Sequence, residues 1–258
     1  SEPWLGGKKP VQFSTSLSQT KQFLYNPVTR NADKDRRFNI TGITFGLAKR
    51  LSVPDDYFTL SQAISFQHYN LKNYNTGLFT FGNGYSNNLA YTIGLSRNST
   101  FNDPIFPVGG SNFSVTAKLS PPYSLWNGTD YEALNQQQED GTLTAAEVDQ
   151  EKFKWLEYYK IKFNGTWYNR LVGKFVLKTS AEYGFLGAYN SDRGVPPFER
   201  FFLGGDGLGG FSLDGRETIA LRGYPNQSLV PIDRSSLSQA TQNDGATIYN
   251  KYSLELRH

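Results

Sequence analysis

Apolar and polar residues alternate along most of the chain. Between residues 11 and 25, for example, Val11, Phe13 and Leu17 fall on one face, whereas serine, threonine and glutamine side chains occupy the other. A period of two is typical of a β-strand with one apolar face. The same pattern recurs and predicts eight strands, at residues 11–25, 38–52, 57–69, 88–98, 112–120, 158–171, 174–189 and 247–257.

The predicted strands are long, and the later ones carry charges on their polar face. Most have roughly 9–15 residues, more than the five or six usual in soluble sheets and enough to cross a bilayer at a tilt. Lys162 lies between Ile161 and Phe163, and Lys178 follows Leu177. Because a lysine facing lipid at the bilayer midplane costs roughly 2–4 kcal/mol, we expect these lysines to face an aqueous interior and the apolar residues to face lipid.

The links between the strands differ in length. Short links are expected at residues 54–57 and 172–174, and long polar links at 26–37, 121–157 and 190–246. Short turns on one side and long loops on the other are typical of bacterial outer-membrane barrels. The pattern therefore predicts an all-β protein, a transmembrane antiparallel β-barrel of the bacterial outer membrane.

One of the long links contains a helix signal. Thr144 and Glu147 have the spacing of a capping box, and helix-forming residues continue to about Leu156. We therefore expect one short helix, on the surface of an external loop.

Composition excludes helices as membrane-crossing elements and leaves strands possible. The 258 residues are 38% hydrophobic, mean hydropathy is −0.52, and no stretch approaches the roughly 18 apolar residues of a transmembrane helix. A net charge of +3, from 26 basic and 23 acidic residues, makes no basic field for nucleic acid, so we expect no such partner. Cysteine is absent, which excludes disulfides, thiolate metal sites and cysteine nucleophiles.

Residues for catalysis are scarce. The two histidines are His68 and the terminal His258, so a Ser-His-Asp triad would depend on His68. His68 continues the apolar face of Phe66 near a strand end, which fits an interfacial residue at a barrel rim. We expect no catalytic residue, no metal and no cofactor, and hence no enzyme.

The segment from Ser191 to Ala246 departs from the alternating pattern. It contains clustered aromatic residues and glycines, and loops of such length are usually functional or disordered. We expect it to fold back into a polar lumen, where an arginine beside a glycine can approach the wall and pair with a carboxylate.

The segment contains the motifs Phe201-Phe202-x-Gly204-Gly205 and Leu221-Arg222-Gly223-Tyr224 and precedes the strand Tyr252-Ser253-Leu254-Glu255, and turns start at Glu2-Pro3 and Asp103-Pro104. Together these motifs resemble those of the BamA family of outer-membrane protein assembly factors. The resemblance implies that residues 1–258 are an internal part of one barrel domain, about strands five to twelve of sixteen, without the POTRA domains and the remaining strands. The eight strands would then form an open meander with a long lumen-inserted loop.

The resemblance also implies a function, that of a non-enzymatic insertase which folds and inserts outer-membrane proteins. Its implied partners are outer-membrane lipids, unfolded outer-membrane protein clients and accessory lipoproteins. Because related proteins share the arginine-glycine-aromatic motif, a polypeptide-exporting secretion pore is an alternative, and a small outer-membrane barrel enzyme is a more remote one. The implied site consists of the loop motif Arg222, Gly223 and Tyr224, the supporting residues Phe201, Phe202, Gly204 and Gly205, and Glu255 as the lumen partner of Arg222.

Overall fold

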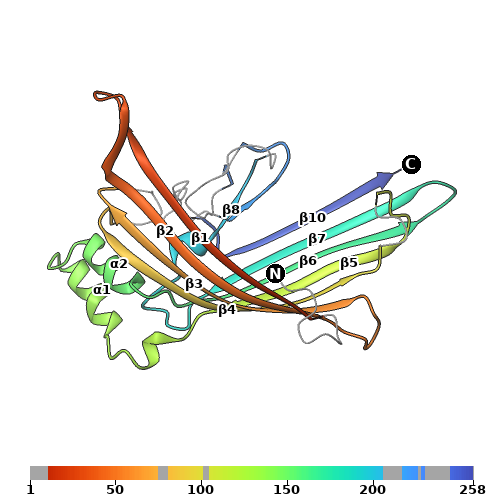
Figure 1. The fold of residues 1–258 in the computed structure, drawn as a ribbon, viewed down its shortest axis with the longest axis horizontal. Coiled ribbons are helices and arrows are strands. Elements are labelled where there is room, and N and C mark those ends of the chain that lie inside the picture. The colour runs from red at the N-terminus through yellow and green to blue at the C-terminus, as the bar shows by residue number, and fades with distance from the viewer. Residues whose placement is uncertain are drawn as a thin grey trace.

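The computed structural model describes residues 11–74, 81–100, 105–205, 217–225, 228–229 and 245–257. Most of them form one antiparallel sheet of eight strands that follow one another in chain order (Figure 1). The strands are β1 (Val11–Asn26), β2 (Asn31–Arg50), β3 (Phe58–Lys72), β4 (Gly84–Asn98), β5 (Gly110–Leu119), β6 (Tyr159–Arg170), β7 (Val176–Gly187) and β10 (Ile248–Arg257).

The sheet is a curved trough rather than a closed cylinder. β1 and β10 form its two edges, and within the described residues each pairs with a single neighbour in this sheet. This confirms the predicted open meander of eight strands.

The two faces of the sheet differ in polarity, as the alternation predicts. Lys162 lies opposite Thr116 on β5 and Gly184 on β7, so these positions share the inner, concave face. The neighbouring positions point outward, and many large apolar side chains among them are exposed. Examples on the outer face are Phe45, Leu47, Ile64, Tyr91, Val115, Ile161, Phe185 and Leu254. In the described part of the chain, no helix has the length and apolar character needed to cross a membrane.

The link between β1 and β2 corrects a prediction. The expected polar loop at residues 26–37 is strand for most of its length, because β1 runs to Asn26 and β2 already begins at Asn31. The extended hairpin projects beyond its neighbours in Figure 1. A strand with solvent on both sides needs no apolar face. The charged residues between Asp33 and Arg37 therefore show no alternation of apolar and polar positions, and the strand could not be recognised from that pattern.

The link between β5 and β6 contains two α-helices, not one. Helix α2 (Ala145–Phe153) is the predicted one, and its capping box is formed, with Thr144 N donating to Glu147 Oε2 at 2.9 Å. It ends before Leu156 because residues 154–156 pair with the edge of β4. Helix α1 (Tyr131–Glu139) was not predicted, since it buries only its first residue and therefore shows no apolar stripe.

The hydrophobic core lies on the concave side, toward the end of the sheet that carries the helices. Phe38 on β2 stacks on Tyr69 of β3, and Tyr69 packs against Phe198 from the loop after β7, with ring centroids 5.0 Å apart. That loop is therefore part of the core. The buried members are Phe38, Tyr69, Leu71, Tyr74, Phe81, Phe153, Leu156, Tyr158, Leu186, Phe198, Phe201, Phe202, Ile219 and Tyr249.

Candidate functional site on the concave face

The loop that follows β7 folds back over the inner face of the sheet. Its described residues include a 3-10 turn, η2 (Pro197–Glu199), and two short parallel strands, β8 (Phe201–Leu203) and β9 (Glu217–Ile219). β8 lies within the trough in Figure 1. The structure thus places the described residues of this loop on the inner face, as the sequence predicts.

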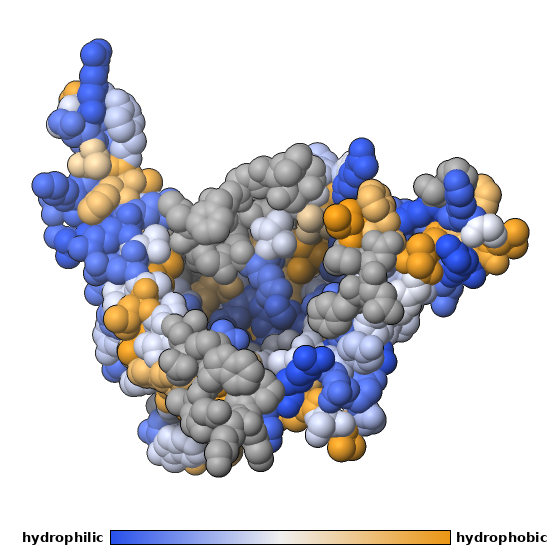
Figure 2. Space-filling model, turned by 45° about the vertical axis from the view of Figure 1, so that its right-hand side comes forward, coloured by the Kyte–Doolittle hydropathy of each residue, from blue (hydrophilic) through white to orange (hydrophobic). Residues whose placement is uncertain are grey.

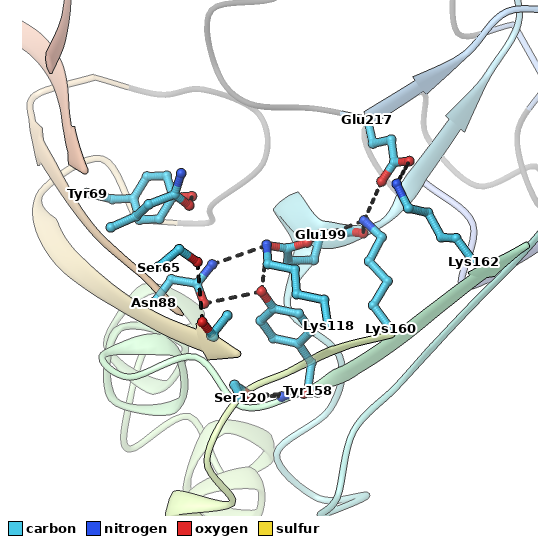
Figure 3. A network of polar contacts seen from close by, with 12 residues as sticks. Ser65, Tyr69, Asn88, Lys118, Ser120, Tyr158, Lys160, Lys162, Glu199 and Glu217 are labelled. Atoms are coloured by element: carbon cyan, nitrogen blue, oxygen red, sulfur yellow. Dashed lines mark hydrogen bonds and ion pairs between the residues drawn. The ribbon is translucent and has the colours of Figure 1, made fainter. Parts of the chain in front are cut away.

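Glu199 is the first anchor of the loop. Its carboxylate forms an ion pair with Lys118 Nζ at 2.6 Å (Figure 3). It also accepts hydrogen bonds from the Tyr158 hydroxyl at 2.8 Å and from Asn88 Nδ2 at 3.2 Å. The main-chain oxygen of Glu199 accepts a further hydrogen bond from Lys160 Nζ at 2.7 Å. These donors come from three strands or their ends, so one buried carboxylate holds the loop against a broad part of the wall.

Glu217, at the start of β9, is the second anchor. It pairs with Lys160 at 2.6 Å and with Lys162 at 2.8 Å. Lys160 is 4% exposed and bridges the two carboxylates, since its Nζ also lies 3.3 Å from Glu199 Oε2. A polar cavity of about 200 Å³ opens beside these groups, and Figure 2 shows hydrophilic residues in the central hollow.

The neighbouring lysines keep the carboxylates of Glu199 and Glu217 ionised. Burial raises the pKa of the Glu199 carboxyl, but the charges of Lys118 and Lys160 outweigh burial and bring its pKa to about 2. Burial also opposes ionisation of Glu217, and Lys160 and Lys162 keep its pKa below the ordinary value. Both groups are therefore ionised at neutral pH. Burial and the charge of Glu199 raise the pKa of Tyr158, which stays a neutral hydrogen-bond donor.

Phe201 provides an apolar contact beside the ion pairs. Its side chain is fully buried, and Lys160 Nζ lies 4.6 Å from its ring centroid. The Tyr249 ring packs edge-on against it, with centroids 4.7 Å apart. Gly184 on β7 leaves the space for this packing, because a Cβ at that position would lie 2.7 Å from Phe201 Cζ. The supporting aromatic predicted from the sequence thus packs against the wall.

The glycines of the two loop motifs bring those motifs together through the backbone. Gly205 N donates to Tyr224 O at 2.9 Å, and Leu221 N donates to Gly205 O at 2.8 Å. Gly223 occupies the third position of a turn closed by Tyr224 N and Leu221 O at 3.3 Å. Its φ of 93° suits a type II turn, a conformation that favours glycine.

Arg222 and Glu255 are not brought together. Arg222 is exposed, and in the described residues no hydrogen bond or ion pair joins it to Glu255, which binds Lys178 at 3.1 Å and Arg257 at 2.7 Å. The reason is the position of the loop along β10. The loop meets this strand at Tyr249, and Glu255 is about 20 Å further along an extended strand.

A second buried ion pair ties the same loop to the helical link. Arg193 donates to Glu157 Oε2 at 2.8 Å, and the two side chains are 2% and 0% exposed. Glu157 also accepts hydrogen bonds from the backbone and the hydroxyl of Ser124, each at 2.7 Å. This pair fixes the outer part of the loop, whereas Glu199 and Glu217 fix its inner part.

Sequence reasoning missed these anchors. The inward position of Lys160 and Lys162 follows from alternation, but their partners lie in the loop at positions that no periodicity marks. His68 was predicted near a strand end, but it lies inside β3, which continues to Lys72, and its Nδ1 is 2.8 Å from Asn87 Oδ1.

The family is decided by a comparison over the whole chain. The model of the Omp85 superfamily domain matches residues 1–258. The chain belongs to the Omp85 superfamily. It is thus a protein of the bacterial outer membrane, and the apolar outer face of its sheet is the lipid-facing one.

A solved structure agrees with this assignment at the level of the fold. The Omp85 chain is similar to BamA from Haemophilus ducreyi lacking POTRA domains 1-3, with a TM-score of 0.62 and 18% sequence identity. The match covers 99% of this chain and 43% of the BamA chain, so the present chain spans less than half of that protein. None of the curated proteins compared with it matches. The predicted BamA-like, outer-membrane fold is confirmed.

Proposed function

We propose that this Omp85 chain is an internal part, about strands five to twelve, of the sixteen-stranded barrel of an outer-membrane protein insertase. The observation that carries the proposal is the loop held on the inner wall by Glu199 and Glu217, in an open antiparallel sheet that resembles the BamA barrel. POTRA domains and the other strands belong, in this proposal, to the rest of the parent protein.

In this proposal the eight strands form the static wall of the insertase. Their apolar outer face meets the membrane lipids, and unfolded client proteins pair by their edges at a seam between the first and last strands of the parent barrel. Accessory lipoproteins bind the parent assembly. The chemistry of the site supports a mechanical role, because its lysines and carboxylates are paired with one another. The proposal invokes no catalysis, metal or cofactor.

The Arg222-Gly223-Tyr224 turn is proposed as the functional tip of the loop. Its support is the exposure of Arg222 and Tyr224 on a turn that Gly205 holds by backbone hydrogen bonds. Arginine offers a planar fork that binds a carboxylate through two hydrogen bonds, and lysine cannot reproduce that geometry. Glu255 is already paired, so the expected partner is a different carboxylate of the parent assembly.

The turn is tested by two substitutions in the parent protein. Arg222→Ala and Arg222→Lys should both lower the rate of client insertion several-fold while the protein itself stays folded. Normal insertion by the lysine variant would show that charge alone suffices and would contradict the role of the planar fork.

The secretion pore stays the second candidate, because superfamily membership fits polypeptide export as well as insertion. The two are separated with the full-length parent protein in lipid vesicles. For an insertase, adding a urea-unfolded outer-membrane barrel should yield folded client in the bilayer much faster than empty vesicles do, as read from its heat-dependent gel mobility. Client folding no faster than in empty vesicles, together with transfer of a partner polypeptide into the vesicle lumen, would favour the pore.

A further inference from the structure

The apolar outer face of the sheet ends at a defined level on β3 and β4. On β3 the outward positions change from Ile64 and Phe66 to His68, and on β4 they change from Leu89 to Asn87. His68 Nδ1 and Asn87 Oδ1 are 2.8 Å apart at this level. Because polar side chains replace apolar ones here on both strands, this level marks the boundary between hydrocarbon and water at the loop end of the sheet.

The link between β5 and β6 returns to the sheet at that boundary. Asn87 N donates to Lys154 O at 2.9 Å and Leu156 N donates to Asn87 O at 2.8 Å, so Trp155 lies beside Asn87 along the edge of β4. Trp155 is 38% exposed, and its ring packs against Phe66 with centroids 6.3 Å apart. A loop residue thus continues the lipid-facing surface of the strands.

Further aromatic residues extend this surface away from the strands. Tyr123 lies 5.3 Å from Trp155 and 6.1 Å from Trp126, in and next to the 3-10 turn η1 (Tyr123–Leu125). Leu125 and Trp126 are 77% and 63% exposed, so the row ends in a large apolar tip. Lys154 adds a positive charge beside the row, with its Nζ 6.0 Å from the ring centroid of Tyr85.

We propose that this row, Phe66, Trp155, Tyr123 and Trp126 with Leu125, binds the interfacial region of the outer lipid leaflet. The occupant follows from continuity, because the row begins on a strand face that already contacts lipid and starts at the level where that face turns polar. Tryptophan and tyrosine prefer this region, since an apolar ring meets acyl chains while a polar atom meets headgroups. Lys154 is placed to meet a lipid phosphate.

The consequence is a membrane-bound position for the link of residues 121–157. Its η1 turn lies along the membrane surface, and the helices α1 and α2 are held close to the headgroups rather than free above them. The inference rests on the outer-membrane location of the chain and not on the insertase proposal, so either one can fail alone.

Fluorescence depth measurements test the inference in the full-length protein. In vesicles of phosphatidylcholine and phosphatidylglycerol, Trp126 should be quenched several-fold more strongly by acyl chains brominated near the carbonyl than by chains brominated at the end. Aqueous iodide should quench it weakly. The difference between wild type and Trp126→Phe isolates the signal without replacing the other tryptophans.

A matched control is a tryptophan placed in water. Val28, at the tip of the β1–β2 hairpin, is 89% exposed, and Val28→Trp should be quenched by iodide and not by brominated lipid. If Trp126 behaves like this control in vesicles, the proposal is overturned.

Discussion

Lys160 is the residue that contacts both carboxylates that anchor the loop. It is almost fully buried, it pairs with Glu199 and Glu217, and its charge lies over the ring of Phe201. A buried ion pair adds little over an apolar pair of the same shape, but removing one partner leaves an uncompensated charge. Single substitutions at this cluster should therefore have large effects on the loop.

Glu199→Gln is the most informative of these substitutions. It should lower the free energy of unfolding in urea by about 3 kcal/mol, since Lys118 then loses its only carboxylate among the described residues and Tyr158 a charged acceptor. Glu151→Gln is the control, because it makes the same chemical change on the exposed surface of α2. Equal stability of the two variants would contradict the anchor.

The same anchor predicts a dependence on pH. The pKa of Glu199 is about 2 in the folded protein and 4.5 in its reference state, so its ionisation stabilises the fold above pH 4.5 and ceases to do so as pH falls toward 2. The stability difference between wild type and Glu199→Gln should be constant from pH 5 to 7 and shrink between about 4.5 and 2. Urea unfolding at each pH measures it, and a difference that stays constant down to pH 2 would rule the assignment out.

Gly184 provides a steric test of the loop packing. Gly184→Ala places a methyl group against Phe201 and Tyr249, and should destabilise the protein by about 1–3 kcal/mol through overpacking. Gly109→Ala is the control, because a Cβ there meets nothing within 4 Å. Thermal unfolding of both variants measures the difference, and equal stability of the two variants would contradict the close packing of Tyr249 and Phe201 at this position.

At the scale of elements, the strands could be predicted because lipid on one side and water on the other impose a period of two. The bounds of β3 to β7 and of β10 agree with the predicted ranges to within a few residues, whereas the short loop strands β8 and β9 were not predicted. Prediction failed where that constraint is absent. The arm around Asp33 has water on both faces, and helix α1 buries only Tyr131. The anchors Glu199 and Glu217 could not be predicted. Which loop carboxylate pairs with Lys160 depends on the path of the loop over the sheet, and the sequence pattern does not show that path.

Arg193 and Glu157 form the buried ion pair that ties the helical link to the loop. Glu157→Gln should leave the Arg193 guanidinium without its carboxylate partner and cost about 3–5 kcal/mol locally. Amide hydrogen exchange should accelerate in α2 and around Ser124 but not in the centre of β6. Unchanged exchange in α2 would mean that the helices are held by their contacts with β4 alone.

At the scale of the whole molecule, the loop is a strut, meaning that it contacts both sides of the curved sheet and connects them. It contacts the β2–β3 side through Phe198 and Tyr69, and the β7–β10 side through Phe201 and Tyr249. An open sheet with two free edges has no closure of its own to fix its curvature. The strut therefore supplies stiffness that strand pairing within these residues does not.

The central claim is that a loop locked on the inner wall supports client insertion. The most direct measurement is the rate at which vesicles containing the full-length parent protein fold an added outer-membrane barrel, compared for wild type, Glu199→Gln and Glu151→Gln, each first shown to be folded by its own gel mobility. The rate should be several-fold lower for Glu199→Gln and unchanged for Glu151→Gln. A normal insertion rate for a Glu199→Gln protein whose loop is demonstrably loosened would contradict it.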